Sequence, residues 1–324
     1  MTTSLIVGAT GQTGAYLTRT LIGQGHEVIA TSRNWNETNP WRFEKLGVLD
    51  SVRGLSLSPS DISGIRATLE RCQPDEIYYL AGPSSVAASF HEPKDTLHQI
   101  IDPIVAFLDA MRSAKSSARF FNAASSDCFG FQPLTRLTEE SSFRPRSPYA
   151  VAKSAAFWNV KNYRDAYGLN ASNGILTNHE SPLRGDNFVT QKIIKGLLDV
   201  ASGRKSRVKL GATGVSRDWL WAGDVAEAIT QINGAAQPSD YVVASGKSST
   251  LQEFIQLACR QLDLDPETVI EHDRQLFRPT DIESISLDPG KILRDFGWQA
   301  RHDLKDIVRT LLAGEFDPIS SEKA

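Results

Sequence analysis

A short apolar strand that runs into a glycine-rich turn and then a helix is the feature that most restricts how this sequence can fold. Ser4–Val7 are mostly apolar, glycines follow at positions 8, 11 and 14, and a helical run extends from Ala15 to Gly23. Glycines at this spacing permit a tight turn, close approach of the backbone to a pyrophosphate, and packing of the helix on the strand. The N–H groups at the helix start then face the phosphates. The sequence predicts a dinucleotide-binding loop made of Gly8, Thr10, Gly11, Gln12, Thr13 and Gly14, and a turn without a ligand is the alternative.

Strands and helices alternate after this turn. Apolar runs at 27–31, 55–57, 76–81, 119–123 and 171–177 predict strands, and the segments 62–72, 96–113 and 149–167 predict helices. This order is typical of an α/β protein with a Rossmann-like, doubly wound parallel sheet. The sequence pattern changes after residue 177, where the regular series of sheet strands and helices gives way to polar loops. This change predicts a smaller C-terminal α+β substrate domain. The predicted boundaries are 1–177 for the dinucleotide-binding domain, to which 216–246 returns, 178–215 and 247–314 for the substrate domain, and 315–324 for a polar tail.

The residues after the second and fourth strands indicate which cofactor the loop would hold. In NAD-binding chains an acidic residue usually ends the second strand, whereas Ser32, Arg33 and Asn34 stand here. An arginine can pair with a 2′-phosphate that a carboxylate would repel, so Arg33 favours NADP; a solvated surface charge is the alternative. Leu80 and Ala81 end the fourth strand before small residues that suit a backbone lying against a nicotinamide ribose, although an ordinary turn also fits them.

Tyr149 and Lys153 are the predicted centre of the chemistry. They are four residues apart in Ser-Pro-Tyr-Ala-Val-Ala-Lys, so they share one helix face. A lysine ammonium beside a phenol lowers the phenol pKa, and the phenolate can take a proton from an alcohol. Ser125 could donate to a substrate oxygen and Asp127 could act as a base at the carboxyl end of a strand. The alternatives are an ordinary half-exposed helix face and two residues that only cap a turn.

Composition narrows the class of protein. The chain has 324 residues, a net charge of −3 and three scattered cysteines. Mixed charge gives no support for binding nucleic acid or a membrane surface, and the cysteines argue against a disulfide framework or a zinc site. The sequence shows no signal peptide or membrane span. We therefore expect a cytoplasmic protein without a metal.

The longest motifs resemble those of the GDP-mannose 4,6-dehydratase family, within the extended short-chain dehydrogenases/reductases and the NAD-dependent epimerase/dehydratase superfamily. The segment 143–153 is similar to the family's active-site helix start nearly letter for letter. Segments 173–176, 178–182 and 188–190 and the triplets 217–219 and 278–280 also match, and 8–14 aligns without a gap. The resemblance spans nearly the whole chain.

The resemblance implies a tightly held NADP, a GDP-hexose substrate, and a redox-neutral reaction that gives a GDP-4-keto-6-deoxy sugar. It implies that Tyr149 takes the C4 hydroxyl proton and that a carboxylate removes the C5 proton before water leaves C6. By position it places Ser84 near the sugar and Asn178, Lys192, Arg217 and Arg278 at the diphosphate. Arg184 and Val189 complete the predicted substrate-binding set, and cations that converge on one cleft would hold a diphosphate. By analogy it implies a homodimer or homotetramer.

One departure from the family keeps a second function open. Asp127 stands where the family has glutamate. The side chain is shorter by one carbon–carbon step, about 1.5 Å, and elimination needs that carboxylate, whereas hydride transfer at C4 does not. The alternatives are an NADPH-dependent reductase or an epimerase that acts on a GDP-4-keto-6-deoxy sugar, and a nucleotide sensor without turnover. Intact Tyr149 and Lys153 argue against the sensor.

Overall fold

Seven parallel strands form the central sheet of the protein. The computed structural model describes residues 1–132, 136–277 and 279–318. The strand order is β10-β6-β5-β4-β1-β2-β3, and every neighbouring pair is parallel. The strands are β1 Thr3–Val7, β2 Glu27–Ser32, β3 Val52–Ser56, β4 Glu76–Tyr79, β5 Arg119–Ser125, β6 Ala171–Leu176 and β10 Asp240–Val243. This confirms the predicted Rossmann-like fold class.

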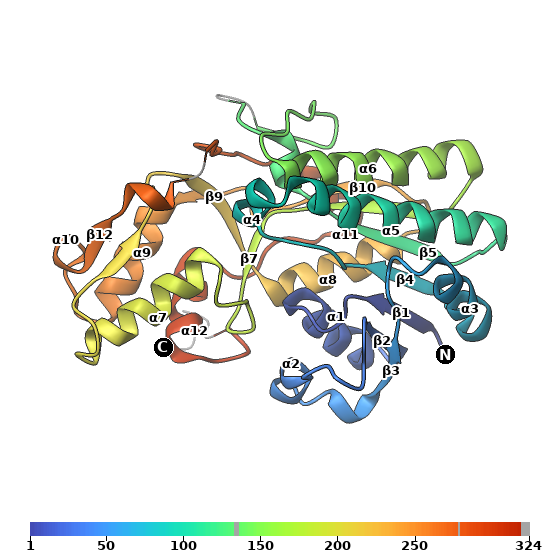
Figure 1. Cartoon of the computed structure of the whole chain (residues 1–324), viewed down its shortest axis with the longest axis horizontal. Helices are drawn as coiled ribbons and strands as arrows, with labels where there is room; N and C mark the ends of the chain where they lie inside the picture. The colour runs from blue at the N-terminus through green and yellow to red at the C-terminus, as the bar shows by residue number, and fades with distance from the viewer. Residues whose placement is uncertain (133–135, 278, 319–324) are drawn as a thin grey trace.

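Helices cover both faces of this sheet (Figure 1). The helices of one face are α1 Gln12–Gly23 and α8 Ala222–Asn233, and those of the other are α3 Ile62–Cys72, α5 Pro93–Ser113 and α6 Pro148–Tyr167. Two short helices, α2 Trp41–Lys45 and α4 Val86–His91, lie in connecting segments, and 3₁₀ turns occupy Leu49–Ser51 and Ser126–Phe129. Helix α5 continues through the buried Pro103.

A smaller lobe is built from several segments that follow residue 177 (Figure 1). A three-stranded sheet has the order β11-β9-β7, and β8 pairs with β12. The strands are β7 Asn178–Glu180, β8 Val208–Leu210, β9 Ser216–Trp221, β11 Ser248–Thr250 and β12 Ile270–His272. The helices are α7 Val189–Ala201, α9 Leu251–Gln261, α10 Pro266–Val269 and α12 Leu304–Ala313, with a 3₁₀ turn at Arg274–Leu276. Helix α11 Gly290–Phe296 instead lies against β10 of the central sheet, where Phe296 packs on Tyr241 (Figure 1).

The sequence interpretation differs from the structure in several elements of this lobe. Residues 178–180 form β7, which was not among the predicted strands and which exists because it pairs with β9. Helix α12 was not predicted, although Asp303 caps its first turn and Gly314 follows its last residue. The predicted domain boundaries stay a prediction: α8 and β10 lie at the seven-stranded sheet, whereas β9 belongs to the three-stranded one. Residues 319–324 of the predicted tail lie outside the described residues.

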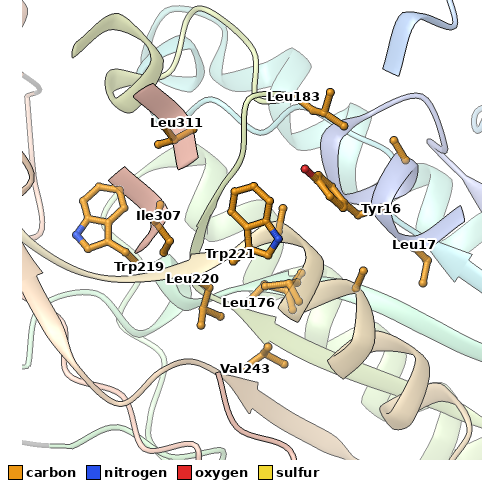
Figure 2. Packing of buried hydrophobic residues seen from close by; sticks show 14 of the residues in the cluster. Tyr16, Leu17, Leu176, Leu183, Trp219, Leu220, Trp221, Val243, Ile307 and Leu311 are labelled. Atoms are coloured by element: carbon orange, nitrogen blue, oxygen red, sulfur yellow. The ribbon is translucent and has the colours of Figure 1, made fainter. Parts of the chain in front are cut away.

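One apolar cluster joins the two lobes (Figure 2). Tyr16 of α1 packs edge-on against Trp221 of β9 with ring centroids 5.7 Å apart. Ile307 and Leu311 of α12 belong to the same cluster. Buried aromatic rings contribute much of the packing energy of such clusters. The contact between Tyr16 and Trp221 therefore fixes the three-stranded sheet relative to α1. In the described part of the chain, no helix combines the length and apolarity needed to cross a membrane.

Candidate active site

The carboxyl ends of the central strands open into one large cleft. The chain runs from β1 to β2 and β3 on one side and returns to β4 on the other side of β1, so the strand order reverses between β1 and β4. A cleft of about 1690 Å³ lies there and extends to the smaller lobe. Its walls include all predicted site residues in the described part of the chain: Gly8, Thr10, Gly11, Gln12, Thr13, Gly14, Arg33, Leu80, Ala81, Ser84, Ser125, Asp127, Tyr149, Lys153, Asn178, Arg184, Val189, Lys192 and Arg217. Arg278 lies outside the described residues.

The glycine loop has the shape that a pyrophosphate needs. Gly8 has φ +86°, and a Cβ there would lie 2.9 Å from the backbone of Ala81. A Cβ on Gly14 would lie 2.5 Å from the carbonyl oxygen of Ala9. Gly11 begins α1 without a side-chain cap, and the first turn carries no acidic residue. The helix start can therefore accept an anion, and the chain's own residues fit a dinucleotide.

Arg33 lies just after β2 on the same cleft. Its side chain is exposed, and the preceding residue, Ser32, shares a hydrogen bond of 2.7 Å with the hydroxyl of Thr38. The carbonyl of Asn34 accepts from the same hydroxyl, which folds this turn back on itself. Arg33 is therefore an exposed residue at the end of β2 that lines the cleft.

Helix α6 presents Tyr149 and Lys153 to the cleft. Pro148 occupies its first turn, and the Ser147 hydroxyl accepts a hydrogen bond of 3.1 Å from the Ala150 N–H. This cap and the proline explain why the helix begins immediately before Tyr149. Tyr149 and Lys153 are both 8% exposed, and the Lys153 ammonium lies 6.0 Å from the Tyr149 ring centroid. The predicted pair shares one helix face.

The electrostatics of this pair differ from the sequence prediction. Burial raises the pKa of Tyr149 above its ordinary value, and the nearby Asp127 raises it further. A hydrogen bond with Ser125 and the charge of Arg184 lower the pKa of Tyr149 but do not outweigh burial. Burial also lowers the pKa of Lys153 from 10.5 to about 8, and its Nζ donates 2.8 Å to the Ala123 carbonyl. The predicted lowering of the Tyr149 pKa is therefore wrong for this structure, because the dry surroundings raise it.

Ser125 and Asp127 lie together where β5 ends. The Ser125 hydroxyl accepts a hydrogen bond of 3.2 Å from the Asp127 N–H and caps the following 3₁₀ turn. Ser125 therefore caps a turn, as the alternative interpretation predicted. Both Ser125 and Asp127 also line the cleft. Gly130 ends the turn at φ +63°, and a Cβ there would lie 2.0 Å from the Arg144 carbonyl oxygen. The close backbone contact holds the Asp127 turn in place.

The predicted cations Arg184, Lys192 and Arg217 line the part of the cleft that the smaller lobe contributes. Lys192 is exposed on α7, whereas Arg217 of β9 is 7% exposed. The Arg217 guanidinium donates 2.6 Å to the Ile282 carbonyl and 2.9 Å to the Asp281 carboxylate, so its position is fixed and its charge is paired. Arg184 lies over the Phe188 ring at 4.1 Å.

Sequence reasoning missed the groups that hold these cations. Glu180 is 1% exposed and forms an ion pair of 3.2 Å with Arg184, and its carboxylate accepts 2.6 Å from the Thr190 hydroxyl. Burial raises the pKa of Glu180. The spacing of four residues between Glu180 and Arg184 was the sequence feature that could have predicted this ion pair. No local spacing could have predicted the pair of Asp281 with Arg217, because the two residues are 64 positions apart.

A doubly wound sheet whose glycine loop and Tyr-x-x-x-Lys helix open on one cleft defines an extended short-chain dehydrogenase/reductase. Structural similarity agrees with this class. A dTDP-glucose 4,6-dehydratase from Bacillus anthracis, solved with NAD, matches with a TM-score of 0.84 at 15% identity and covers 97% of this chain and 96% of its own. The RMD protein of Pseudomonas aeruginosa, solved with NADPH, matches with a TM-score of 0.80 at 21% identity, with 97% and 99% covered.

Within this class, the chain belongs to the GDP-mannose 4,6-dehydratase family. The family model described as GDP-mannose 4,6 dehydratase matches residues 5–311. The chain is similar to GDP-mannose 4,6 dehydratase 1 of Arabidopsis thaliana, at 36% identity over 330 residues, which covers 99% of this chain and 91% of the relative. The family resemblance seen in the motifs is confirmed.

Proposed function

We propose that this protein is an NADP-dependent GDP-mannose 4,6-dehydratase that makes a GDP-4-keto-6-deoxy sugar. The observation that carries the proposal is the single cleft that holds the glycine loop, the Tyr149–Lys153 pair and the substrate-side cations together. Membership of the GDP-mannose 4,6-dehydratase family supports the hexose and the reaction.

The cofactor half of the cleft supports a nicotinamide dinucleotide and, through Arg33, its 2′-phosphate. The bound nicotinamide would supply a two-electron acceptor that takes hydride from the sugar C4 and returns it to C6. The glycine loop would hold the pyrophosphate on the N–H groups at the start of α1, and Leu80 and Ala81, which line the same cleft, would lie against the nicotinamide ribose. Arg33 provides the charge that distinguishes NADP from NAD.

Four side chains divide the chemistry. Tyr149 takes the proton of the C4 hydroxyl, and Ser125 donates to the C4 oxygen and keeps the sugar in register. The 4-ketone acidifies C5, so Asp127 can remove the C5 proton as hydroxide leaves C6 and becomes water with that proton. C5 is protonated again as C6 is reduced, and Tyr149 gives up the proton that it took from the C4 hydroxyl to balance this step. Lys153 holds the ribose and, when charged, favours the Tyr149 phenolate. Tyr149 and Lys153 are both buried. The attraction between a Tyr149 phenolate and a charged Lys153 is therefore stronger than it would be in water.

The substrate half is assigned to the GDP part. Lys192, Arg184 and Arg217 would hold the diphosphate. The family resemblance assigns the same role to Arg278, which lies outside the described residues. Asn178 and Val189 border the nucleotide, and Ser84 lies on the sugar side. Two of the three described cations are held by carboxylates, which fixes their geometry before the substrate arrives.

Incubation with GDP-mannose tests the function. The purified protein with NADP should convert GDP-mannose to a product lighter by one water, with no net change of NADPH absorbance. Tyr149→Phe should lower the rate at least about a hundredfold, because it removes the phenolic proton carrier. Tyr163→Phe, on the same helix but only partly buried, is the matched control and should leave the rate unchanged. No dehydration under these conditions would reject the proposal.

A second candidate function depends on Asp127. Its carboxylate is shorter than the family glutamate, and hydride transfer to a 4-ketone does not require it. An NADPH-dependent reductase, or an epimerase, would therefore leave GDP-mannose unchanged. The reductase would oxidise NADPH when the 4-keto product of another dehydratase is supplied, and the epimerase would change that product's stereochemistry without net oxidation.

The exposed face of α6 supports self-association into a homodimer or homotetramer. Val151 and Trp158, seven residues apart, are 45% and 54% exposed on one side of this helix. Apolar side chains at this spacing suit packing against a second copy. The three free cysteines, Cys72, Cys128 and Cys259, support a reducing cytoplasm. Light scattering of the wild type and of Trp158→Ser tests the association: the variant should have the lower mass.

A further inference from the structure

A set of hydrogen bonds connects the glycine-loop helix to the segment that carries the substrate-side residues. The Gln12 amide donates 3.0 Å to the carbonyl of His179, and the Ser181 hydroxyl donates 2.7 Å to the Gln12 amide oxygen. The hydroxyl of Thr13 lies 2.7 Å from His179 Nε2. Gln12 and Thr13 form the first turn of α1, whereas His179 and Ser181 lie in and just after β7. We name these four residues the bridge.

The bridge has one fixed arrangement of protons. His179 Nδ1 lies 2.8 Å from the carbonyl oxygen of Thr177, which can only accept, so Nδ1 carries the proton. Burial, helped by the charge of Arg184, lowers the pKa of His179 to about 4, so the ring is neutral near pH 7. Nε2 must then accept, and the hydroxyl of Thr13 donates to it. A polar chain with a single satisfied arrangement is rigid, because any displacement leaves a partly buried group unpaired.

The substrate side of the bridge extends to α7. The Gln191 amide donates 3.0 Å to the carbonyl of Ser181, and the hydroxyl of Thr190 donates to the Glu180 carboxylate. Lys192 follows on the same helix and lines the cleft. Figure 2 shows Leu183, two residues beyond the bridge, in one apolar cluster with Tyr16 of α1 and Trp221 of β9. A shift of β7 is therefore transmitted both to α1 and to Lys192.

We propose that His179 and Ser181 are positioning residues that couple the two halves of the cleft, so that a nucleotide diphosphate on the substrate side tightens dinucleotide binding at the glycine loop. This inference rests on the proposed function for the identity of the two ligands. A diphosphate among the substrate-side cations adds its contacts to those that already hold β7 and α7, and the bridge passes this added restraint to the first turn of α1. By linkage, the dinucleotide tightens the diphosphate site by the same factor.

The coupling is measured with NADP and GDP. GDP lacks the hexose that would reach the nicotinamide. Direct repulsion between the two anions would weaken NADP binding, so tighter binding of NADP in the presence of GDP must pass through the protein. The dissociation constant of NADP is measured by calorimetry without GDP and with saturating GDP, and the ratio of the two constants is the coupling factor. A factor of about ten is expected for the wild type.

Ser181→Ala and Thr13→Val each remove one donor of the bridge without adding volume, and each should lower the coupling factor at least about threefold. Thr13→Ser retains the hydroxyl and should restore it. Ser172→Ala is the matched control, because Ser172 is an equally buried serine that accepts from a backbone N–H near the amino end of β6, and its coupling factor should equal that of the wild type. A wild-type factor of one, or an unchanged factor in both bridge variants, overturns the inference. Failure of the wild type to bind NADP or GDP would instead reject the proposed function.

Discussion

Replacing Lys153 with methionine is expected to stabilise the fold and to remove turnover. Lys153 is 8% exposed, and burial lowers its pKa from 10.5 to about 8. The lowered pKa means that the folded protein binds the lysine proton less well than the unfolded chain does. Near neutral pH the buried charge therefore weakens the fold, and a neutral side chain of similar length removes that cost.

The magnitude follows from the two pKa values. The interval from 10.5 to about 8 corresponds to about 3 kcal/mol of lost stability below pH 8, at about 1.4 kcal/mol per pKa unit. Methionine also loses the hydrogen bond of 2.8 Å from Nζ to the Ala123 carbonyl, which contributes about 1 kcal/mol. The net gain in the free energy of unfolding is about 2 kcal/mol near neutral pH.

The sign of the pH dependence gives a second check. Between pH 8 and 10.5 the unfolded chain holds more protons than the folded one, so the stability of the wild type rises with pH across this window. Urea unfolding of the wild type and of Lys153→Met is measured at about pH 6.5 and at about pH 10. The variant should have the larger free energy of unfolding at the lower pH, and the two proteins should be equally stable at the higher pH. Turnover should fall at least about a hundredfold, because the residue that tunes Tyr149 is gone.

Lys161→Met is the matched control for this prediction. Lys161 lies on the same helix, its side chain is 40% exposed, and it pairs with Asp165 at 3.5 Å. Its replacement should change the unfolding free energy by less than about 1 kcal/mol, because exposed ion pairs contribute little. A Lys153→Met variant that is less stable near neutral pH, or whose advantage persists unchanged at high pH, would refute the account of a desolvated lysine.

Three further predictions concern the cofactor loop and the carboxylate. Gly14→Ala places a Cβ 2.5 Å from a carbonyl oxygen of the preceding loop and should cost about 1–3 kcal/mol in thermal unfolding; Gly23→Ala on the same helix meets nothing within 4 Å and should cost nothing. Arg33→Ser should weaken NADP binding roughly ten- to a hundredfold and leave NAD binding unchanged in fluorescence titrations; the exposed Arg53→Ser on β3 should alter neither, and equal losses for both cofactors would contradict the role. Asp127→Glu should raise the rate of dehydration measured by mass, since a carboxylate misplaced by about 1 Å costs up to about a hundredfold; an unchanged or lower rate would argue against that explanation.

Local pattern was sufficient for the main architecture and for the choice of candidate residues. The alternation of strands and helices predicted the parallel sheet, and the spacing of Tyr149 and Lys153 placed both on one face of α6. Elements whose signal is only tertiary were missed. Strand β7 is three residues long and exists because β9 pairs with it, so its own sequence reads as a loop.

The sequence by itself determined the glycine loop, the capped start of α6 and the identity of the groups in the cleft, because turns, caps and helix spacing depend on residues a few positions apart. Only the tertiary structure decided how those groups behave. Burial, which no linear pattern records, raises the pKa of Tyr149 and lowers that of Lys153. The ion pair of Arg217 with Asp281 and the bond between Thr13 and His179 join residues 64 and 166 positions apart. Contacts of that range are set by how the two lobes pack, since desolvation and hydrogen bonding depend on distance in space.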